Sequence, residues 1–90
     1  MKNIQGQMIT NTFDLLSEIN TNSALSNRKR LDIIFSPNEV NFYDFTSKDP
    51  SISLVCLAHY DTLHIWAGKV KEEFEQYKDQ FPGKYIVIHL

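Results

Sequence analysis

Two histidines and an aspartate form the arrangement in this chain that comes closest to a reactive site. His59 and His64 flank the pair Asp61-Thr62. If residues 61 and 62 form a two-residue hairpin loop, the two imidazoles face each other with Cβ atoms about 5 Å apart. That spacing suits a shared metal ion, or a small acid–base site built from His59, His64 and Asp61. Threonine resists the positive φ of such loops, and a metal ion needs a third or fourth ligand, so we expect no metal site.

The single cysteine is the only nucleophile worth pairing with a histidine base. Cys56 lies in the apolar run Leu54-Val55-Cys56-Leu57, whereas a catalytic cysteine needs an exposed and electropositive position. We therefore expect a buried structural thiol. A lone cysteine cannot form an internal disulfide, which fits the reducing cytoplasm better than secretion.

Two aspartates, Asp32 and Asp44, form a carboxylate pair across an expected hairpin. Paired acids perform general acid–base chemistry when burial pushes their pKa values apart. Both occupy polar positions of the pattern, so we expect solvated surface charges. No catalytic residue, metal or cofactor is assigned on these grounds, and we expect that the protein is not an enzyme.

The chain has one cluster of basic residues, Arg28-Lys29-Arg30. Three adjacent cations ahead of a strand can contact phosphates, so a nucleic-acid-associated subunit is an alternative function. However, nine Lys and Arg residues against eleven Asp and Glu residues give a net charge of −2, and nucleic-acid binders usually carry a basic surface. We therefore expect the cluster to keep an edge or loop hydrated, and we do not expect nucleic acid as the partner.

Four residues are candidates for binding a partner protein: Tyr43, Tyr60, His64 and Trp66. His64 and Trp66 share one face of an expected strand, and Tyr43 can share that face in a suitable register. Two helices can cover the sheet with one on each face, or both can lie on one side. The second arrangement leaves an aromatic sheet face open, and aromatic side chains are enriched at protein interfaces.

The hydrophobic periodicity predicts the elements that must position these residues. In chain order we expect a short strand over residues 3–9, a helix capped by Asn11 or Thr12, a hairpin over 31–45, strands over 52–59 and 63–67, a helix over 69–81 and a strand over 85–90. The fold class is α+β, with the order (β)αββββαβ. It comprises a four-stranded antiparallel meander flanked by two helices, with a C-terminal strand.

Two packing expectations follow from this pattern. The helix over 69–81 is expected to pack on the sheet through Val70, Phe74 and Tyr77, which follow at helical spacing. The uninterrupted apolar run Ile86-Val87-Ile88 is typical of a strand inside a sheet, so we expect the last strand to be internal.

The bulk properties indicate a single small domain over residues 1–90, since longer chains are needed before domains divide. The composition is 42% hydrophobic and 22% charged, which excludes a disordered chain. The first residues carry no apolar segment typical of a signal peptide, and no apolar run reaches the ~20 residues of a membrane span. We expect a soluble cytoplasmic domain without membrane association.

The opening segment Ile4-Gln5-Gly6-Gln7, followed by a capped helix, resembles the start of barstar-like ribonuclease inhibitors. The resemblance ends at Asn20, because the family's aromatic-glycine and tryptophan-bearing helix motif has no counterpart after it. The strand-rich middle also differs from that family's helix-rich fold. Membership is therefore not assigned, and no binding residue is carried over.

Together these observations favour a non-enzymatic protein-binding module, a small inhibitor or regulator that acts by occupying a partner protein. Immunity proteins, antitoxins and phage counter-defence proteins are classes of this kind. The partner is expected to be another protein, a second copy in a homodimer, or both. The alternatives are a nucleic-acid-associated subunit that uses residues 28–30, and a small enzyme that uses His59, His64 and Asp61.

Overall fold

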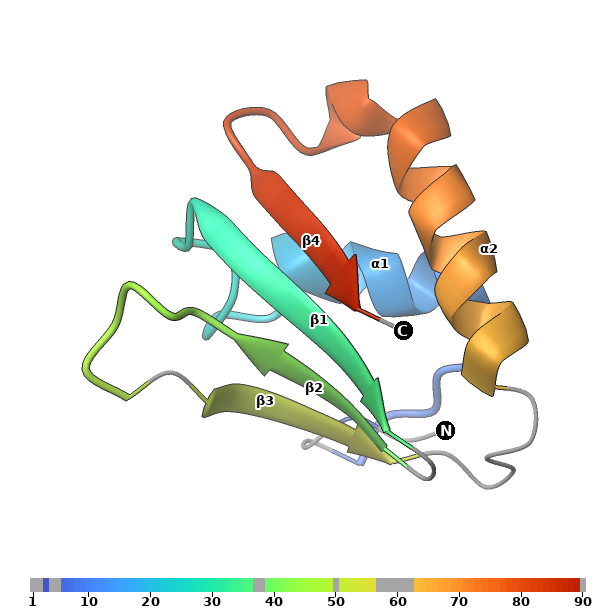
Figure 1. The fold of residues 1–90 in the computed structure, drawn as a ribbon, viewed down its shortest axis with the longest axis horizontal. Helices are drawn as coiled ribbons and strands as arrows, with labels where there is room; N and C mark the ends of the chain where they lie inside the picture. The colour runs from blue at the N-terminus through green and yellow to red at the C-terminus, as the bar shows by residue number, and fades with distance from the viewer. Residues whose placement is uncertain (1–2, 4–5, 37–38, 50, 57–62, 90) are drawn as a thin grey trace.

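A computed structural model describes residues 3, 6–36, 39–49, 51–56 and 63–89, with the backbone alone for 51–56, 63 and 64. The described elements are α1 (Thr12–Thr21), β1 (Arg30–Ser36), β2 (Glu39–Tyr43), β3 (Ser51–Cys56), α2 (Leu63–Gln76), the 3-10 helix η2 (Lys78–Gln80) and β4 (Tyr85–His89). The strands form one mixed sheet in the order β3-β2-β1-β4 (Figure 1). β4 runs parallel to β1, and the other neighbours are antiparallel.

The expected four-stranded antiparallel meander is wrong, because residues 63–67 begin helix α2 instead of forming a strand. Leu63, Ile65 and Ala67 alternate as they would in a strand. However, Ala67 also precedes Val70 and Phe74 at three- and four-residue spacing, and these three residues are buried as one helix face. A short apolar run satisfies both periods, and the helical pattern continues for 14 residues, which decides between them.

Packing of α2 through Val70 and Phe74 is confirmed, since both are buried. Tyr77 is instead 36% exposed, because α2 ends at Gln76 and does not continue to residue 81. Helix η2 follows and returns Phe81 to the core, where its ring centroid lies 5.6 Å from that of Phe74.

The described residues before α1 contain no strand in place of the one expected over 3–9, only the single β-bridge residue Met8. The Asn3 N–H donates to the Gln7 carbonyl and the Gly6 N–H donates to the Asn3 carbonyl, both at 3.0 Å. Gly6 adopts a φ of +80°, a conformation that glycine tolerates and other residues rarely adopt. Ile9 is buried, whereas Met8 is 61% exposed.

Helix α1 begins as the sequence predicts. The side chain of Asn11 accepts a hydrogen bond from the Asp14 N–H at 2.8 Å, which satisfies one of the free donors at a helix start. Leu15, Leu16 and Ile19 of α1 are fully buried. The helix is therefore held mainly by its apolar face.

The expected hairpin is confirmed by the antiparallel pairing of β1 and β2, with Ser36 opposite Glu39. Residues 37 and 38, which connect them in the chain, lie outside the described residues. β3 pairs antiparallel with β2, as expected of the third strand. The alternation of β1 and β2 directs four residues into the core, all fully buried: Leu31, Ile33, Val40 and Phe42.

Strand β4 lies at an edge of the sheet, which corrects the expectation of an internal last strand. Among the described strands it pairs with β1 alone. Parallel pairing requires a crossover connection, and α2 provides it by linking β3 to β4. Ile86 and Ile88 pack against the core, while Val87 lies opposite Asp32 on the other face of the sheet.

Both helices cover the same face of the sheet, here called the inner face. The buried residues of α1 and α2 form one cluster with the inward residues of β1 and β2, and α1 passes behind β1 and β4 in Figure 1. Neither helix covers the opposite face, here called the outer face. The structure thus follows the arrangement in which one sheet face stays open.

Candidate functional site

A buried carboxylate lies near the centre of the outer face. Asp32 of β1 is only 3% exposed, although neither helix covers this face. The Arg30 Nε atom donates a hydrogen bond to Asp32 Oδ1 at 3.1 Å, and His89 Nε2 lies 2.8 Å from Asp32 Oδ2. Both carboxylate oxygens are therefore engaged. We call these three side chains the Asp32 network.

The sheet register explains how the network forms. Arg30 and Asp32 are two residues apart on β1, so their side chains share the outer face. His89 is opposite Ile34 on β1 and reaches back to Asp32. Burial raises the pKa of Asp32, but the hydrogen bonds and charges of His89 and Arg30 outweigh it and hold that pKa below its usual value. The hydrogen bond and charge of Asp32 raise the pKa of Arg30.

Aromatic rings flank the network on both sides. The guanidinium carbon of Arg30 lies 5.1 Å from the ring centroid of Tyr85, its neighbour in the parallel register, within the range of a cation–π contact. On β2, Tyr43 is opposite Asp32 and stacks on Phe45, with centroids 5.4 Å apart and rings 4° from parallel. Phe45 is 55% exposed and Tyr85 is 61% exposed. We call the set of Arg30, Tyr43, Phe45 and Tyr85 the aromatic patch.

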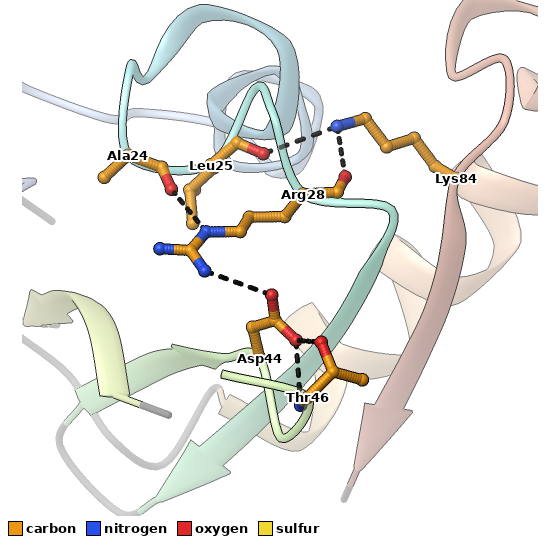
Figure 2. Close-up of polar contacts among 6 residues, drawn as sticks. All are labelled: Ala24, Leu25, Arg28, Asp44, Thr46 and Lys84. Atoms are coloured by element: carbon orange, nitrogen blue, oxygen red, sulfur yellow. Dashed lines mark hydrogen bonds and ion pairs between the residues drawn. The ribbon is translucent and has the colours of Figure 1, made fainter. Parts of the chain in front are cut away.

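The other arginine of the basic cluster, Arg28, binds a second buried carboxylate, that of Asp44. Arg28 Nη1 lies 3.2 Å from Asp44 Oδ2, and Arg28 Nε donates to the Ala24 carbonyl at 3.3 Å (Figure 2). Asp44 also accepts hydrogen bonds from the Thr46 N–H, at 3.0 Å, and from the Thr46 hydroxyl. The Thr46 hydroxyl is the main reason that the pKa of Asp44 is lowered; burial opposes it, and the Thr46 N–H and Arg28 add to it.

These contacts correct two expectations about charged residues. Asp32 and Asp44 are not solvated surface charges, since they are 3% and 4% exposed, and they are not opposite each other, because Tyr43 is the cross-strand neighbour of Asp32. Arg28 and Arg30 each neutralise one of these carboxylates. Of the basic cluster, the cation of Lys29 is left without such a carboxylate partner among the described residues.

Lys84 ties the start of β4 to the turn before β1. Its ammonium donates to the carbonyls of Ser26, at 2.7 Å, and Arg28, and it lies 3.4 Å from the Leu25 carbonyl. Figure 2 shows the contacts with Leu25 and Arg28 beside the Arg28–Asp44 pair. Burial lowers the pKa of Lys84. Every hydrogen bond that the structure shows for the Lys84 ammonium goes to a backbone carbonyl. We therefore assign Lys84 a structural role.

The residues predicted to bind a partner do not form one set in the described structure. Tyr43 lies on the outer face within the aromatic patch. Trp66 lies on helix α2 and packs partly buried against the core, so it is not on a sheet face. His64 is in the first turn of α2, where the structure describes the backbone alone. Tyr60 lies outside the described residues.

The histidine pair expected across a hairpin loses its basis, because the strand that was to carry His64 is helical. His59 and Asp61 lie outside the described residues. Within the part of the chain that the structure describes, no three His, Cys, Asp or Glu side chains are grouped to hold a metal ion. Cys56 ends β3, and its side chain is not among those described.

Three residues of the outer face are functional candidates that the sequence reasoning did not bring together: Asp32, Tyr85 and His89. Asp32 and Arg30 carried a usable signal, because opposite charges two residues apart in a strand share a face. Tyr85 and His89 share a face by the same alternation. The parallel register of β1 and β4 brings the pair Arg30 and Asp32 beside the pair Tyr85 and His89. No local sequence pattern indicates that register.

Compared with known proteins, the chain matches no family model, no curated protein and no solved structure. The resemblance of its opening segment to barstar-like inhibitors therefore gains no support. No helix in the described ranges combines the length and apolar character that a membrane crossing needs.

Proposed function

We propose that the protein is a non-enzymatic protein-binding module, a small cytoplasmic inhibitor or regulator that occupies a partner protein with the outer face of its sheet. One observation carries this proposal: the aromatic patch on a sheet face that neither helix covers. Tyrosine and arginine are the residue types that dominate binding energy at interfaces. Exposed Phe45 and Tyr85 on one open face are otherwise costly to leave in water.

The Asp32 network supports this proposal by holding the patch in place. Arg30 is fixed between Asp32 and the ring of Tyr85, so it loses less side-chain freedom when a partner binds. Its guanidinium has five N–H donors, of which Nε is used by Asp32. The remaining donors suit a carbonyl oxygen of the partner, which needs no free positive charge, with apolar partner groups against Phe45 and Tyr85.

The nucleic-acid alternative has weaker support. Phosphate binding needs cations that are not already neutralised, and Arg28 and Arg30 each bind a buried carboxylate. The enzyme alternative rests on His59, His64 and Asp61, which the described side chains do not include.

The test begins with affinity capture from the source cells, which identifies the partner for a direct binding measurement with purified proteins. Tyr85→Ala and Phe45→Ala should each raise the Kd about 30-fold, the ~2 kcal/mol of a hot-spot residue. Ile65→Ala is the matched control, because Ile65 is 58% exposed but belongs to helix α2.

Circular dichroism should show that all three variants keep the fold. An unchanged Kd for both outer-face variants, or a loss confined to Ile65→Ala, would contradict the proposed surface. Salt-sensitive retention of the parent chain on DNA or RNA, reduced by Lys29→Ala, would favour the nucleic-acid alternative instead.

A further inference from the structure

The free edge of β4 presents backbone groups that the sheet does not use. The Tyr85 N–H donates to the Lys29 carbonyl at 2.7 Å, so Tyr85 directs its backbone groups toward β1. Along a strand this direction alternates, and therefore Val87 and His89 also bond to β1. The N–H and C=O groups of Ile86 and Ile88 point the opposite way, toward the edge where no described strand pairs.

The centre of this edge lacks the residues that usually protect a sheet edge. Natural edges carry charged residues, prolines or bulges that block pairing with another chain. Here the centre of the strand is Ile86-Val87-Ile88, paired with β1 in an unbroken register. Helix α2 contacts both β1 and β4 and covers the inner face, but the backbone of a helix is bonded within the helix and cannot pair with a strand.

The strand is complementary to itself in the antiparallel direction. With a two-fold axis at Val87, Tyr85 is opposite His89 of the partner subunit, and Ile86 is opposite Ile88 of the partner subunit. The edge-facing groups of Ile86 and Ile88 then exchange four N–H···O bonds across the axis, as hydrogen-bonded antiparallel pairs do. No like charges meet, and the isoleucines of the two copies extend each other's core face.

From this complementarity we propose that two copies of the chain pair through their β4 edges, antiparallel about a two-fold axis at Val87, and join their sheets into one. A second copy is the favoured occupant because a two-fold contact closes on itself, whereas pairing of β4 with another edge would propagate into a fibre. The inference does not rest on the proposed function, since the outer faces of both copies stay open in the dimer.

The first test measures mass by light scattering coupled to gel filtration over a hundredfold range of protein concentration. The purified parent chain should reach twice 10.5 kDa. Val87→Lys should weaken dimerisation at least tenfold, because it places two like charges together at the axis. Ile34→Lys is the matched control and should leave the dimer intact. Ile34 is also half-buried and alternates onto the outer face, but it lies on β1, an internal strand away from the β4 edge.

A second test does not depend on the stability of a lysine variant. In a Cys56→Ser background, Val87→Cys should cross-link two copies in oxidised glutathione, because a non-hydrogen-bonded antiparallel pair places its Cα atoms about 4.5 Å apart, within the range of a disulfide. Tyr85→Cys and Ile34→Cys should not cross-link. A parent chain that stays monomeric at every concentration overturns the proposal. A dimer that Val87→Cys fails to cross-link overturns it as well, because that dimer uses another surface.

Both tests use the purified chain alone, so their result is separate from that of partner binding. If the parent chain is monomeric but Phe45→Ala still raises the partner Kd, the proposed β4 dimer is wrong and the proposed function stands. If the β4 dimer forms but Phe45→Ala leaves the partner Kd unchanged, only the outer-face proposal is wrong.

Discussion

His89 Nε2 lies 2.8 Å from Oδ2 of Asp32, although the two residues are 57 positions apart in the chain. The contact ties the last strand to the central one on a face that neither helix covers. Arg30 completes the network from the other carboxylate oxygen. A charged group so deeply buried on an open sheet face has to be paired, because an unpaired buried carboxylate is strongly destabilising.

The first prediction concerns the Asp32 network. Asp32→Asn should lower the free energy of unfolding at neutral pH by about 1–2 kcal/mol, because two charge-assisted hydrogen bonds weaken while solvent reaches them from the open face. Urea denaturation followed by circular dichroism measures the change. Asp79→Asn, at an exposed residue of η2, is the control and should leave stability unchanged.

The same variant should alter the response to acid. Since the folded-state pKa of Asp32 lies below its usual value, the carboxylate contributes stability above the unfolded-state pKa of about 4, and this is lost as the pH falls through the folded value. Asp44 acts in the same direction. The loss of stability of Asp32→Asn below about pH 4 should therefore be shallower than that of the parent. Parallel curves for the two proteins would show that Asp32 titrates normally.

A second prediction tests how α2 packs. Phe74 is 6% exposed and touches Phe81, so Phe74→Ala should cost about 3–5 kcal/mol, the usual cost of removing a buried aromatic ring. Tyr77→Ala should cost much less, since Tyr77 is 36% exposed and contacts Phe13 edge-on. If both variants lose the same free energy of unfolding in a urea titration, both rings lie in the core. That result would contradict the end of α2 at Gln76.

These two predictions separate what the sequence determines locally from what it does not. The cap at Asn11, the hairpin of β1 and β2, and the buried pair Val70 and Phe74 follow from residues close together in the chain, and the structure confirms them. Residues 63–67 satisfy the period of a strand and that of a helix at once, so local pattern could not decide between them.

The pairing of β4 is the other part that the sequence could not show. Its apolar centre is typical of an interior strand, yet it lies at the edge, because the α2 crossover places it beside β1 and no later strand follows among the described residues. The Asp32 network depends on this long-range register. Its three residues can be read from the sequence, but the sequence does not predict that they contact one another.

A third prediction concerns the Lys84 anchor. Its ammonium holds carbonyls of the turn before β1, so Lys84→Met should lower the free energy of unfolding by about 1 kcal/mol, the net value of lost hydrogen bonds. Hydrogen exchange should also quicken at the Arg28 N–H, which bonds to the Leu25 carbonyl within that turn. Lys71→Met, at an exposed position of α2, is the control. If the two variants melt alike, the anchor contributes nothing to stability.

A fourth prediction removes β4. A chain ending at Gly83 loses Lys84 together with Ile86 and Ile88, which pack against the core. It also exposes the edge of β1, a seven-residue strand that includes Leu31, Ile33 and Phe35. We expect this truncation to aggregate or to lose its cooperative unfolding transition. A truncated chain that stays monomeric and unfolds cooperatively would mean that α1, α2 and the first three strands suffice for the fold.

The last prediction separates the two surfaces that the aromatic residues suggest. If residues 63–67 formed a strand with Trp66 on a sheet face, Trp66→Glu would disrupt a partner site and leave the fold intact. Trp66 instead packs partly buried against the core from helix α2, so a carboxylate there is desolvated without a partner and should destabilise the fold by about 2 kcal/mol or more. Tyr85→Glu, on the exposed outer face, should leave the melting curve nearly unchanged and abolish partner binding. Thermal melts and the binding assay on both variants measure this contrast. A stable Trp66→Glu chain that no longer binds its partner would show that the partner binds helix α2 and not the outer face.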